Sequence, residues 1–495
     1  MAEKVNGSLP KYKKDLVYTV IGICIYIIFG YCIPHSEPLT DMSMQLLGIF
    51  LMTIFLWSTV STTWPSLLAI FMLGTTGYCS GSEAMMQCFG HGMAGFVAIM
   101  LIFNVALTDT GFSRRVALFF VTRKFIKGKP WLIMFMFFFA VWFVSAFVTS
   151  SAVYAMFLSI GAEMLTMTKF TDDDDLPEAM YCTMAWVDQI NQGSTPMSHT
   201  NVLLAMSLCL SLLGYDPSFM TVCVCGLVGC FAQFILVWLE FRFLQKPNVQ
   251  KMAELDIEAL KATVPPMSKR EKAIAVAFIA LIIMWVFPET ISKIPGLESF
   301  GGMLENLTTY APPLLIVAAC SVIPVEGRPL LNLKEACAKI NWGAWMMMAA
   351  LMGMATFIGY EDYGLMPWLS ETIGGAMNNL GVSGLVFAMI AIAIVGFVTN
   401  FMSNTASCTL ANAFIPVVVA IGGANPVAMT MCIGMICNSG FMIPSANPVM
   451  GVCCSLPQVR ISYSIKYGVI ASILCIIATC AIAYPLFSLL MPYGG

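Results

Sequence analysis

The sequence contains few charged residues. Asp, Glu, Lys and Arg make up only 10% of its 495 residues, whereas a soluble domain carries roughly a quarter. Hydrophobic residues account for 59% of the chain, and the mean hydropathy is +0.84. Many apolar runs reach the about 20 residues that a helix needs to cross a bilayer. The scarcity of charge therefore excludes an ordinary soluble protein and predicts an all-α polytopic membrane protein.

Two further absences limit the chemistry. The 18 cysteines are scattered through apolar stretches, with no CxxC pair and no cysteine–histidine cluster at zinc spacing, so we expect them to be small buried hydrophobic residues. No grouping of His, Asp and Glu suits a catalytic metal or a nucleophile with its base. The sequence thus argues against an enzyme, and we expect neither an organic cofactor nor a nucleic-acid partner.

What is present is a long series of apolar stretches. Two of them, 131–167 and 381–422, are long enough for two passes but have no polar connector, which predicts hairpins that enter and leave the membrane on the same side. About eleven transmembrane helices remain. The predicted segments are a cytoplasmic N-terminus (1–15), a first repeat (16–244) with an interfacial arm (111–130), a hairpin (131–167) and a broken helix (181–213), a cytoplasmic linker (245–272), and a second repeat (273–495) with a hairpin (381–422), a broken helix (425–456) and a last helix (467–491).

The positions of Lys and Arg predict the orientation. With the N-terminus in the cytoplasm, the basic residues of 114–129, 242–272 and 328–339 all fall on the cytoplasmic side, while Lys293 falls outside, in line with the positive-inside rule. The C-terminus then lies outside. We expect the protein to reside in the plasma (inner) membrane. Two full spans joined by a tight turn in place of either hairpin would give the same charge distribution.

The two halves of the chain repeat. The stretch "AFVTSSAVYAMFLSI" from Ala146 aligns with "NFMSNTASCTLANAF" from Asn400, an offset of 403 − 149 = 254. Each half continues into a helix interrupted by proline and polar residues, "DQINQGSTPMSHTNVLLAM" and "MICNSGFMIPSANPVMGVC". In the predicted orientation the two hairpins open to opposite sides, so the repeats are inverted. Inverted repeats with interrupted helices indicate a secondary transporter whose site lies near the bilayer midplane.

The predicted hairpin tips contain hydroxyl and amide side chains and no Lys or Arg. Helix N-termini at such a tip favour anions, while hydroxyl and carbonyl oxygens suit a hard cation such as sodium. Ser145 and Thr399 lie four residues before the two tips. Their matching positions favour a cation role over a hydrogen bond to the preceding helical turn.

One acidic residue, Asp188, lies deep in the first broken helix. Ionisable groups inside a membrane are costly and usually functional, although a place near the wetted end of the span would also accommodate it. His199 lies at the break of the same helix, and histidine titrates near neutral pH. Asp188 and His199 are therefore candidates for ion or proton coupling, and a plain hydrogen-bonding role for His199 is the alternative.

The motifs "SNTASCTLANAFIP" and "MIPSANPVMG" resemble those of the divalent anion:sodium symporter (DASS) family, which transports di- and tricarboxylates and sulfate. The resemblance covers essentially the whole chain. It implies a homodimer in the lipid bilayer, with scaffold and transport domains that work as an elevator, and sodium as the coupling ion. Ser403-Asn404-Thr405 matches the family's Ser-Asn-Thr tip signature, whereas Thr149-Ser150-Ser151 lacks the central Asn.

Site residues follow from the resemblance by position. The implied substrate contacts are Thr149, Ser150, Ser151, Ser198, Asn201, Ser403, Asn404, Thr405, Asn447 and Pro448. The implied sodium ligands are Ser145, Thr149, Ser150 and the backbone near Met197 for a first ion, and Thr399, Met402, Asn404 and the backbone near Ala446 for a second. Ser150 is shorter than Asn and cannot serve a cation and a carboxylate in the same geometry, which leaves the first sodium site open.

These observations predict a secondary active transporter of small organic anions, with sodium-coupled dicarboxylate symport as the leading interpretation. The missing tip Asn leaves a sodium-independent dicarboxylate exchanger or a proton-coupled anion transporter as alternatives. A channel is less consistent with paired broken helices and occluding tips. A cation/proton antiporter would normally need more than one buried acid, and Asp188 stands alone among the predicted transport helices.

Overall fold

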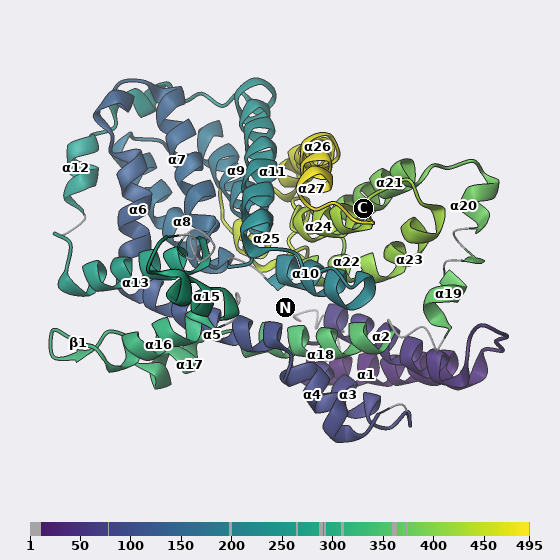
Figure 1. The fold of residues 1–495 in the computed structure, drawn as a ribbon. Coiled ribbons are helices and arrows are strands. Elements are labelled where there is room, and N and C mark those ends of the chain that lie inside the picture. Colours follow the sequence, from purple (N-terminus) through teal and green to yellow (C-terminus); the bar gives the residue numbers. More distant parts are fainter. Residues whose placement is uncertain are drawn as a thin grey trace, which may run out of the picture. The chain divides into compact units, whose positions relative to one another are not determined.

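The computed structural model describes residues 11–77, 79–197, 200–263, 266–286, 291, 294–307, 311–358, 364–369, 371–372 and 375–494. Almost every element in these ranges is a helix (Figure 1). The one exception is a short antiparallel pair, β1 (Pro324–Val325) with β2 (Arg328–Pro329). The helical class predicted from the sequence is confirmed. The chain divides into two compact units, residues 1–94 with 341–381 and residues 95–340 with 382–495.

Several helices are suited to a bilayer. Within the described residues, five helices have the length and apolar composition to cross a membrane, or six when the bent pair 81–89 and 94–109 counts as one. The five are 12–32, 150–167, 219–245, 404–421 and 461–490. Further apolar helices of 10–17 residues accompany them. A multi-pass membrane protein is therefore confirmed, while the count of about eleven crossings stays a prediction.

The smaller unit is a helical bundle. Its described helices are α1 (Lys11–Ile27), α2 (Asp41–Thr59), α3 (Trp64–Leu73), α4 (Gly81–Phe89), α18 (Trp342–Ile358), α19 (Leu365–Leu369) and α20 (Gly375–Asn379). Capping boxes start two of them, Thr40 with Ser43 for α2 and Ser80 with Glu83 for α4. Helix α2 packs against α1 and α3, and α18 packs against α3 and α4. Helix α5 (Gly92–Asp109) begins at the boundary between the units.

The larger unit contains both predicted hairpins and both predicted broken helices. Its remaining helices are α6 (Phe112–Val121), α7 (Pro130–Ser145), α8 (Ser150–Met167), α9 (Asp175–Asn191), α10 (Thr200–Leu213), α11 (Phe219–Glu240), α12 (Ile257–Ala262), α13 (Lys269–Val286), α15 (Glu298–Asn306), α16 (Pro312–Val322), α17 (Leu333–Lys339), α21 (Gly384–Val398), α22 (Asn404–Thr409), α23 (Ala411–Ile421), α24 (Pro426–Ile436), α25 (Pro448–Cys453), α26 (Ile461–Ala478) and α27 (Tyr484–Leu490). Every site residue predicted from the sequence belongs to this unit.

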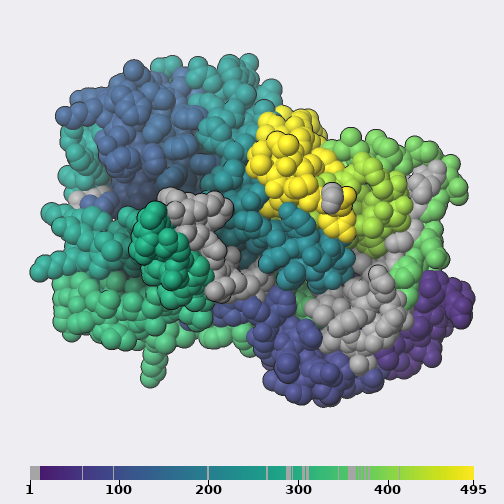
Figure 2. Space-filling model, in the orientation of Figure 1, coloured from purple at the N-terminus to yellow at the C-terminus, as the bar shows by residue number. Residues whose placement is uncertain are grey.

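Helix pairs α7–α8 and α21–α22 are each joined by a short non-helical turn, which gives the two tips. Between Pro130 and Ser145, helix α7 carries only aliphatic, methionine and aromatic side chains, so these side chains pack mainly by apolar contact. Its aromatic rings meet α11 and the residue that follows it, with ring centroids 5.3 Å apart for Phe135 and Trp238 and 4.9 Å apart for Phe138 and Phe241. Each such pair contributes about 0.5–1.5 kcal/mol beyond its buried area. Helix α11 also packs against α26, and Figure 2 shows the last helices in yellow against the teal surface of this segment.

The basic residues of the predicted arm are partly neutralised inside the protein. Arg115 forms a two-pronged pair with Glu271, with both N···O distances 2.9 Å, and Arg114 lies 3.5 Å from Glu163. These two arginines hold α6 against α13 and α8. The interfacial position of this arm stays a prediction, and contact with the membrane surface would rest mainly on basic residues other than Arg114 and Arg115.

An ion pair fastens the start of α9 to the start of α26. Arg460 Nη2 lies 2.6 Å from Glu178 Oε2, and the Arg460 backbone N–H donates to Glu178 Oε1 at 2.7 Å. Glu178 is only 5% exposed. Its carboxylate raises the pKa of the Arg460 guanidinium above the usual range through their hydrogen bond. The pair fixes α9, which carries Asp188 at its other end.

Replacing Arg460 by Ala is expected to lower the thermal stability of the protein, because it leaves the Glu178 carboxylate buried without its partner. The measurement is thermal unfolding in detergent. Lys334→Ala, which removes an exposed cation from α17, is the control and should melt like the wild type. Equal melting of both variants and the wild type would contradict a structural role for the ion pair.

Candidate functional site

The first tip directs two hydroxyl groups at one buried carboxylate. Helix α7 ends at Ser145 and α8 starts at Ser150, after Thr149 adopts an extended backbone. Asp188 on α9 is fully buried, and it accepts hydrogen bonds from Ser145 Oγ at 2.7 Å and Ser150 Oγ at 2.5 Å. Thr149 is half-buried and Ser151 is exposed. The structure therefore joins Asp188 to Ser145 and Ser150, and it turns Ser151 away from them.

The second tip is built from an amide rather than an acid. Helix α21 ends at Val398 and α22 starts at Asn404, with Ser403 as its N-cap. Thr399 Oγ1 lies 3.2 Å from Asn404 Oδ1 and donates to the backbone carbonyl of Cys437, the residue that follows α24. Three oxygens thus meet in a buried position. Asn404 belongs to the sequence-predicted set, whereas the Cys437 carbonyl was not predicted.

Two hydrogen-bonded bridges connect the halves. Asn404 Nδ2 donates to Gln189 Oε1 at 3.2 Å, and Gln189 Nε2 donates to Ser150 Oγ at 2.5 Å. Because these contacts share Gln189, one amide links the second tip to the first.

The second bridge runs through the break of the first helix. Thr405 Oγ1 donates to Asn201 Oδ1 at 2.9 Å, and Asn201 Nδ2 donates to Asn438 Oδ1 at 2.9 Å. Asn201 and Asn438 are fully buried, and Thr405 is 6% exposed. The predicted substrate contacts Thr405 and Asn201 are therefore neighbours, although they are 204 positions apart in the chain.

Polar residues after α9 hold the backbone of the first tip. Asn191 Nδ2 donates to the carbonyl of Trp142, Gln192 Nε2 to that of Ser145 at 3.2 Å, and Thr195 Oγ1 to that of Ala146. Buried carbonyls at an interrupted helix need such partners. These residues were not among the predicted site positions. Their signal in the sequence is the polar run from Asp188 to Thr195 within an apolar segment.

In the second half the roles are reversed, because a side chain of the tip bonds to the backbone of the break. Asn400 Oδ1 accepts from the backbone N–H groups of Phe441 and Met442 at 2.8 and 3.1 Å. Asn447 caps α25 by accepting from Met450 N at 2.9 Å, and its amide donates to the Gly440 carbonyl at 2.8 Å. Asn447 thus lies at the predicted break, and these two hydrogen bonds of its side chain are to backbone groups.

The remaining predicted positions are less engaged. Met197 is buried, and its carbonyl accepts from Asn104 Nδ2 at 3.5 Å. Ala446 is buried, Met402 and Ser403 are half-buried, and Pro448 is exposed. Ser198 and His199 lie outside the described residues, so the coupling role predicted for His199 stays a prediction.

Close backbone contact at the second tip depends on Gly440. A methyl group at this position would lie 2.9 Å from the Thr399 carbonyl oxygen and 3.3 Å from Asn404 Oδ1. Asn404 Oδ1 belongs to the three-oxygen group of the second tip, and the Thr399 carbonyl belongs to the residue that supplies the hydroxyl of that group. A side chain here would therefore push the break away from the tip.

Gly440→Ala is expected to lower stability by about 1–3 kcal/mol through overpacking and to reduce transport strongly, because the added carbon meets backbone rather than a flexible side chain. Thermal unfolding measures the loss of stability. Uptake of radiolabelled succinate into proteoliposomes, divided by the amount of folded protein, measures the loss of transport. The matched control is Gly95→Ala, where nothing lies within 4 Å of the added carbon. Wild-type uptake by Gly440→Ala would show that the tip tolerates displacement.

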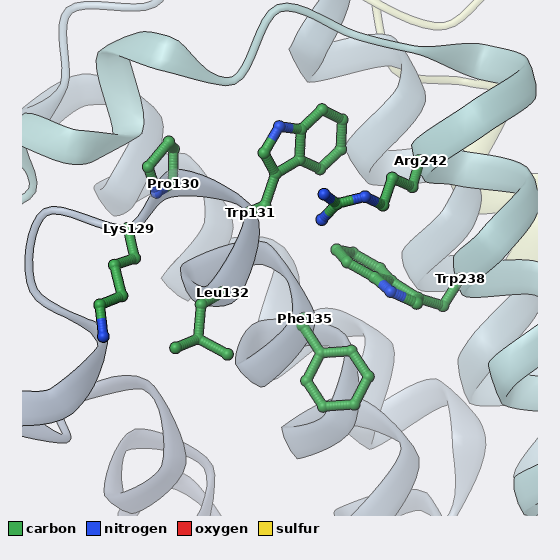
Figure 3. A pocket seen from close by; sticks show the side chains of 7 residues that line it. All are labelled: Lys129, Pro130, Trp131, Leu132, Phe135, Trp238 and Arg242. Atoms are coloured by element: carbon green, nitrogen blue, oxygen red, sulfur yellow. The ribbon is translucent and has the colours of Figure 1, made fainter.

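A separate basic pocket lies at the opposite end of α7. Its volume is about 380 Å³, and it is lined by Lys129, Pro130, Trp131, Leu132, Phe135, Trp238 and Arg242. Figure 3 shows the Arg242 guanidinium between the indoles of Trp131 and Trp238, and it lies 5.0 Å from the Trp131 ring centre. The 15 helical steps from Pro130 to Ser145 span about 22 Å. This pocket is therefore distinct from the polar cluster at the tips.

Comparison with known proteins supports a transporter. The family model described as the sodium:sulfate symporter transmembrane region matches residues 13–491. The sodium-dependent dicarboxylate transporter SdcS of Staphylococcus saprophyticus is 20% identical, covering 95% of this chain and 91% of the relative. The sodium-dependent high-affinity dicarboxylate transporter 2 of Caenorhabditis elegans is 25% identical, over 49% of this chain and 44% of the relative.

Solved structures share the fold. The Alcanivorax borkumensis YdaH transporter superimposes with a TM-score of 0.58 at 15% identity, covering 97% of this chain and 99% of that one. Neisseria gonorrhoeae MtrF, described among antimetabolite efflux pumps, gives a TM-score of 0.53 at 11% identity, covering 97% and 95%. The family resemblance inferred from the two motifs is confirmed, and the protein is a transporter rather than an enzyme.

Proposed function

This chain belongs to the sodium:sulfate symporter family, and from that premise we propose that it is a secondary active transporter that carries a small dicarboxylate together with sodium. The substrate would meet neutral donors of the second tip and of the first break, foremost Asn404, Thr405 and Asn201. The observation that supports this site most strongly is the double bridge between the halves, Gln189 with Asn404 and Asn201 with Thr405. Relatives named as sodium-dependent dicarboxylate transporters support the choice of substrate.

A carboxylate can be held here without a basic side chain. The hydroxyl and amide groups of Thr405, Asn201 and Asn404 are neutral hydrogen-bond donors, and they are already buried. Each carboxylate oxygen would replace one of the mutual hydrogen bonds of the cluster. Because no cation compensates the two negative charges, binding would depend on sodium bound nearby.

The second sodium would bind at the second tip. Its proposed ligands are Thr399 Oγ1, Asn404 Oδ1 and the Cys437 carbonyl, with the carbonyls of Met402 and Ala446 completing the shell. Hydroxyl, amide and carbonyl oxygens are the donors that hard cations prefer. Thr399 Oγ1 and Asn404 Oδ1 are 3.2 Å apart, so one ion could contact both oxygens. Asn404 would then touch sodium through its oxygen and the substrate through its nitrogen, which couples the two.

Alternating access by an elevator movement and assembly as a homodimer belong to the same proposal. The tips and breaks all lie in the larger unit, which is consistent with a mobile transport domain. The predicted cytoplasmic N-terminus and external C-terminus complete the arrangement. The altered first tip, with Ser150 in place of Asn, specifically favours sodium-independent exchange as the second candidate function.

Uptake of radiolabelled succinate into proteoliposomes tests the proposal. We expect uptake that requires an inward sodium gradient and is lost in Asn404→Ala, because that change removes a sodium ligand and a substrate donor together. Arg242→Ala, in the basic pocket at the far end of α7, should retain uptake. Loss in Arg242→Ala with retention in Asn404→Ala would move the anion site to that pocket.

Internal anion separates the two candidate functions. Vesicles loaded with unlabelled succinate, without a sodium gradient, should show little uptake if the protein is a symporter. Rapid uptake under these conditions, unaffected by sodium, would contradict symport and support exchange. Absence of uptake in every condition would contradict succinate as the substrate.

A further inference from the structure

Two pairs of equivalent positions distinguish the halves at the tip and the broken helix. Asn191 and Gly193 align with Asn438 and Gly440, an offset of 438 − 191 = 247, which pairs Asp188 with Met435 (188 + 247 = 435). At the tips, the offset of 254 pairs Ser150 with Asn404. The first half therefore has a carboxyl group on the broken helix where the second has a thioether, and a hydroxyl at the tip where the second has an amide.

The two differences compensate each other in space. In the second half, the amide oxygen of Asn404 stands beside the hydroxyl of Thr399 at 3.2 Å. In the first half, the Asp188 carboxylate stands beside the equivalent hydroxyl of Ser145 at 2.7 Å and also reaches Ser150, 2.5 Å away. Met435 points elsewhere, with its sulfur near Gly229 of α11. An oxygen that the tip supplies in one half is supplied by the helix in the other.

We propose that Asp188 is the charged oxygen ligand of the first sodium site and takes the place of the missing tip asparagine. This inference rests on the proposed function. The sodium ion would lie between Asp188 and the hydroxyl oxygens of Ser145 and Ser150, with the hydroxyl protons turned to other acceptors. One such acceptor exists, because the Val141 carbonyl lies 2.8 Å from Ser145 Oγ.

The charge makes the two sodium sites unequal. A sodium ion at Asp188 neutralises a buried negative charge, whereas one at the neutral second tip adds a positive charge. Ion pairs at short range are strengthened in a medium of low dielectric constant, so the first site should bind sodium more tightly. Until it is filled, the Asp188 charge opposes a dicarboxylate at Asn404, to which it is linked through Ser150 and Gln189. Sodium at the first site should therefore bind before the substrate.

Binding of radiolabelled sodium to the purified, substrate-free protein tests this assignment. The wild type should show a tight and a weaker component. In Asp188→Asn, which keeps the shape and one oxygen but removes the charge, the tight component should weaken by roughly tenfold or more. Thr399→Ala should remove the weaker component and leave the tight one.

The repeat itself supplies a rescue variant. Ser150→Asn combined with Asp188→Met gives the first half the residues of the second, so sodium binding should return as a second neutral, weaker component. Size-exclusion chromatography and thermal unfolding would show that Asp188→Asn and the double variant both fold. Absence of this second component in the folded double variant would contradict the compensation between the two positions.

The outcomes separate this inference from the proposed function. Two unchanged components in Asp188→Asn would overturn the role of Asp188 while leaving sodium symport intact. A wild type that binds no sodium but takes up succinate would instead overturn sodium coupling, and the inference would fall with it.

Discussion

The hydrogen bonds from Gln189 to Asn404 and from Asn201 to Thr405 are the contacts on which the arrangement of the larger unit depends. All four side chains are buried, and an unpaired buried polar group costs about 1–3 kcal/mol. In a bilayer, water is not at hand as a substitute partner. The second tip is thus held against the first broken helix because these buried polar groups must satisfy one another.

The need to pair buried polar groups also applies to the backbone at the interrupted helices. An interrupted helix exposes N–H and C=O groups, and each half meets them with amides. In the first half, Asn191 and Gln192 of the broken helix bond to carbonyls of the tip. In the second half, Asn400 at the tip bonds to N–H groups of the break. The halves reach the same pairing of tip and break with the amides on opposite partners.

The sequence predicts much of this fold because its strongest signals are long and periodic. Apolar stretches predict helices, and the repeat predicts a polar tip in each half. The structure has short non-helical turns at 146–149 and 399–403. The contacts of Asp188 could not be predicted, since nothing in a linear sequence says that a carboxylate on α9 meets Ser145 and Ser150. The role of Gln189 could likewise not be predicted, because a bridge between the halves depends on how the hairpins fold together. The carbonyl of Cys437 has no side-chain signal at all.

The absence of Lys and Arg from the described tips and breaks is consistent with the proposed coupling. A fixed cation would attract a dicarboxylate whether or not sodium were bound, and the substrate could then bind and leave alone. Neutral donors lack that independent attraction, so the electrostatic part of binding must come from sodium. A fixed negative charge at Asp188 increases this dependence, since it disfavours the anion until a cation neutralises it. In the proposed mechanism, the scarcity of charge therefore makes anion binding conditional on sodium.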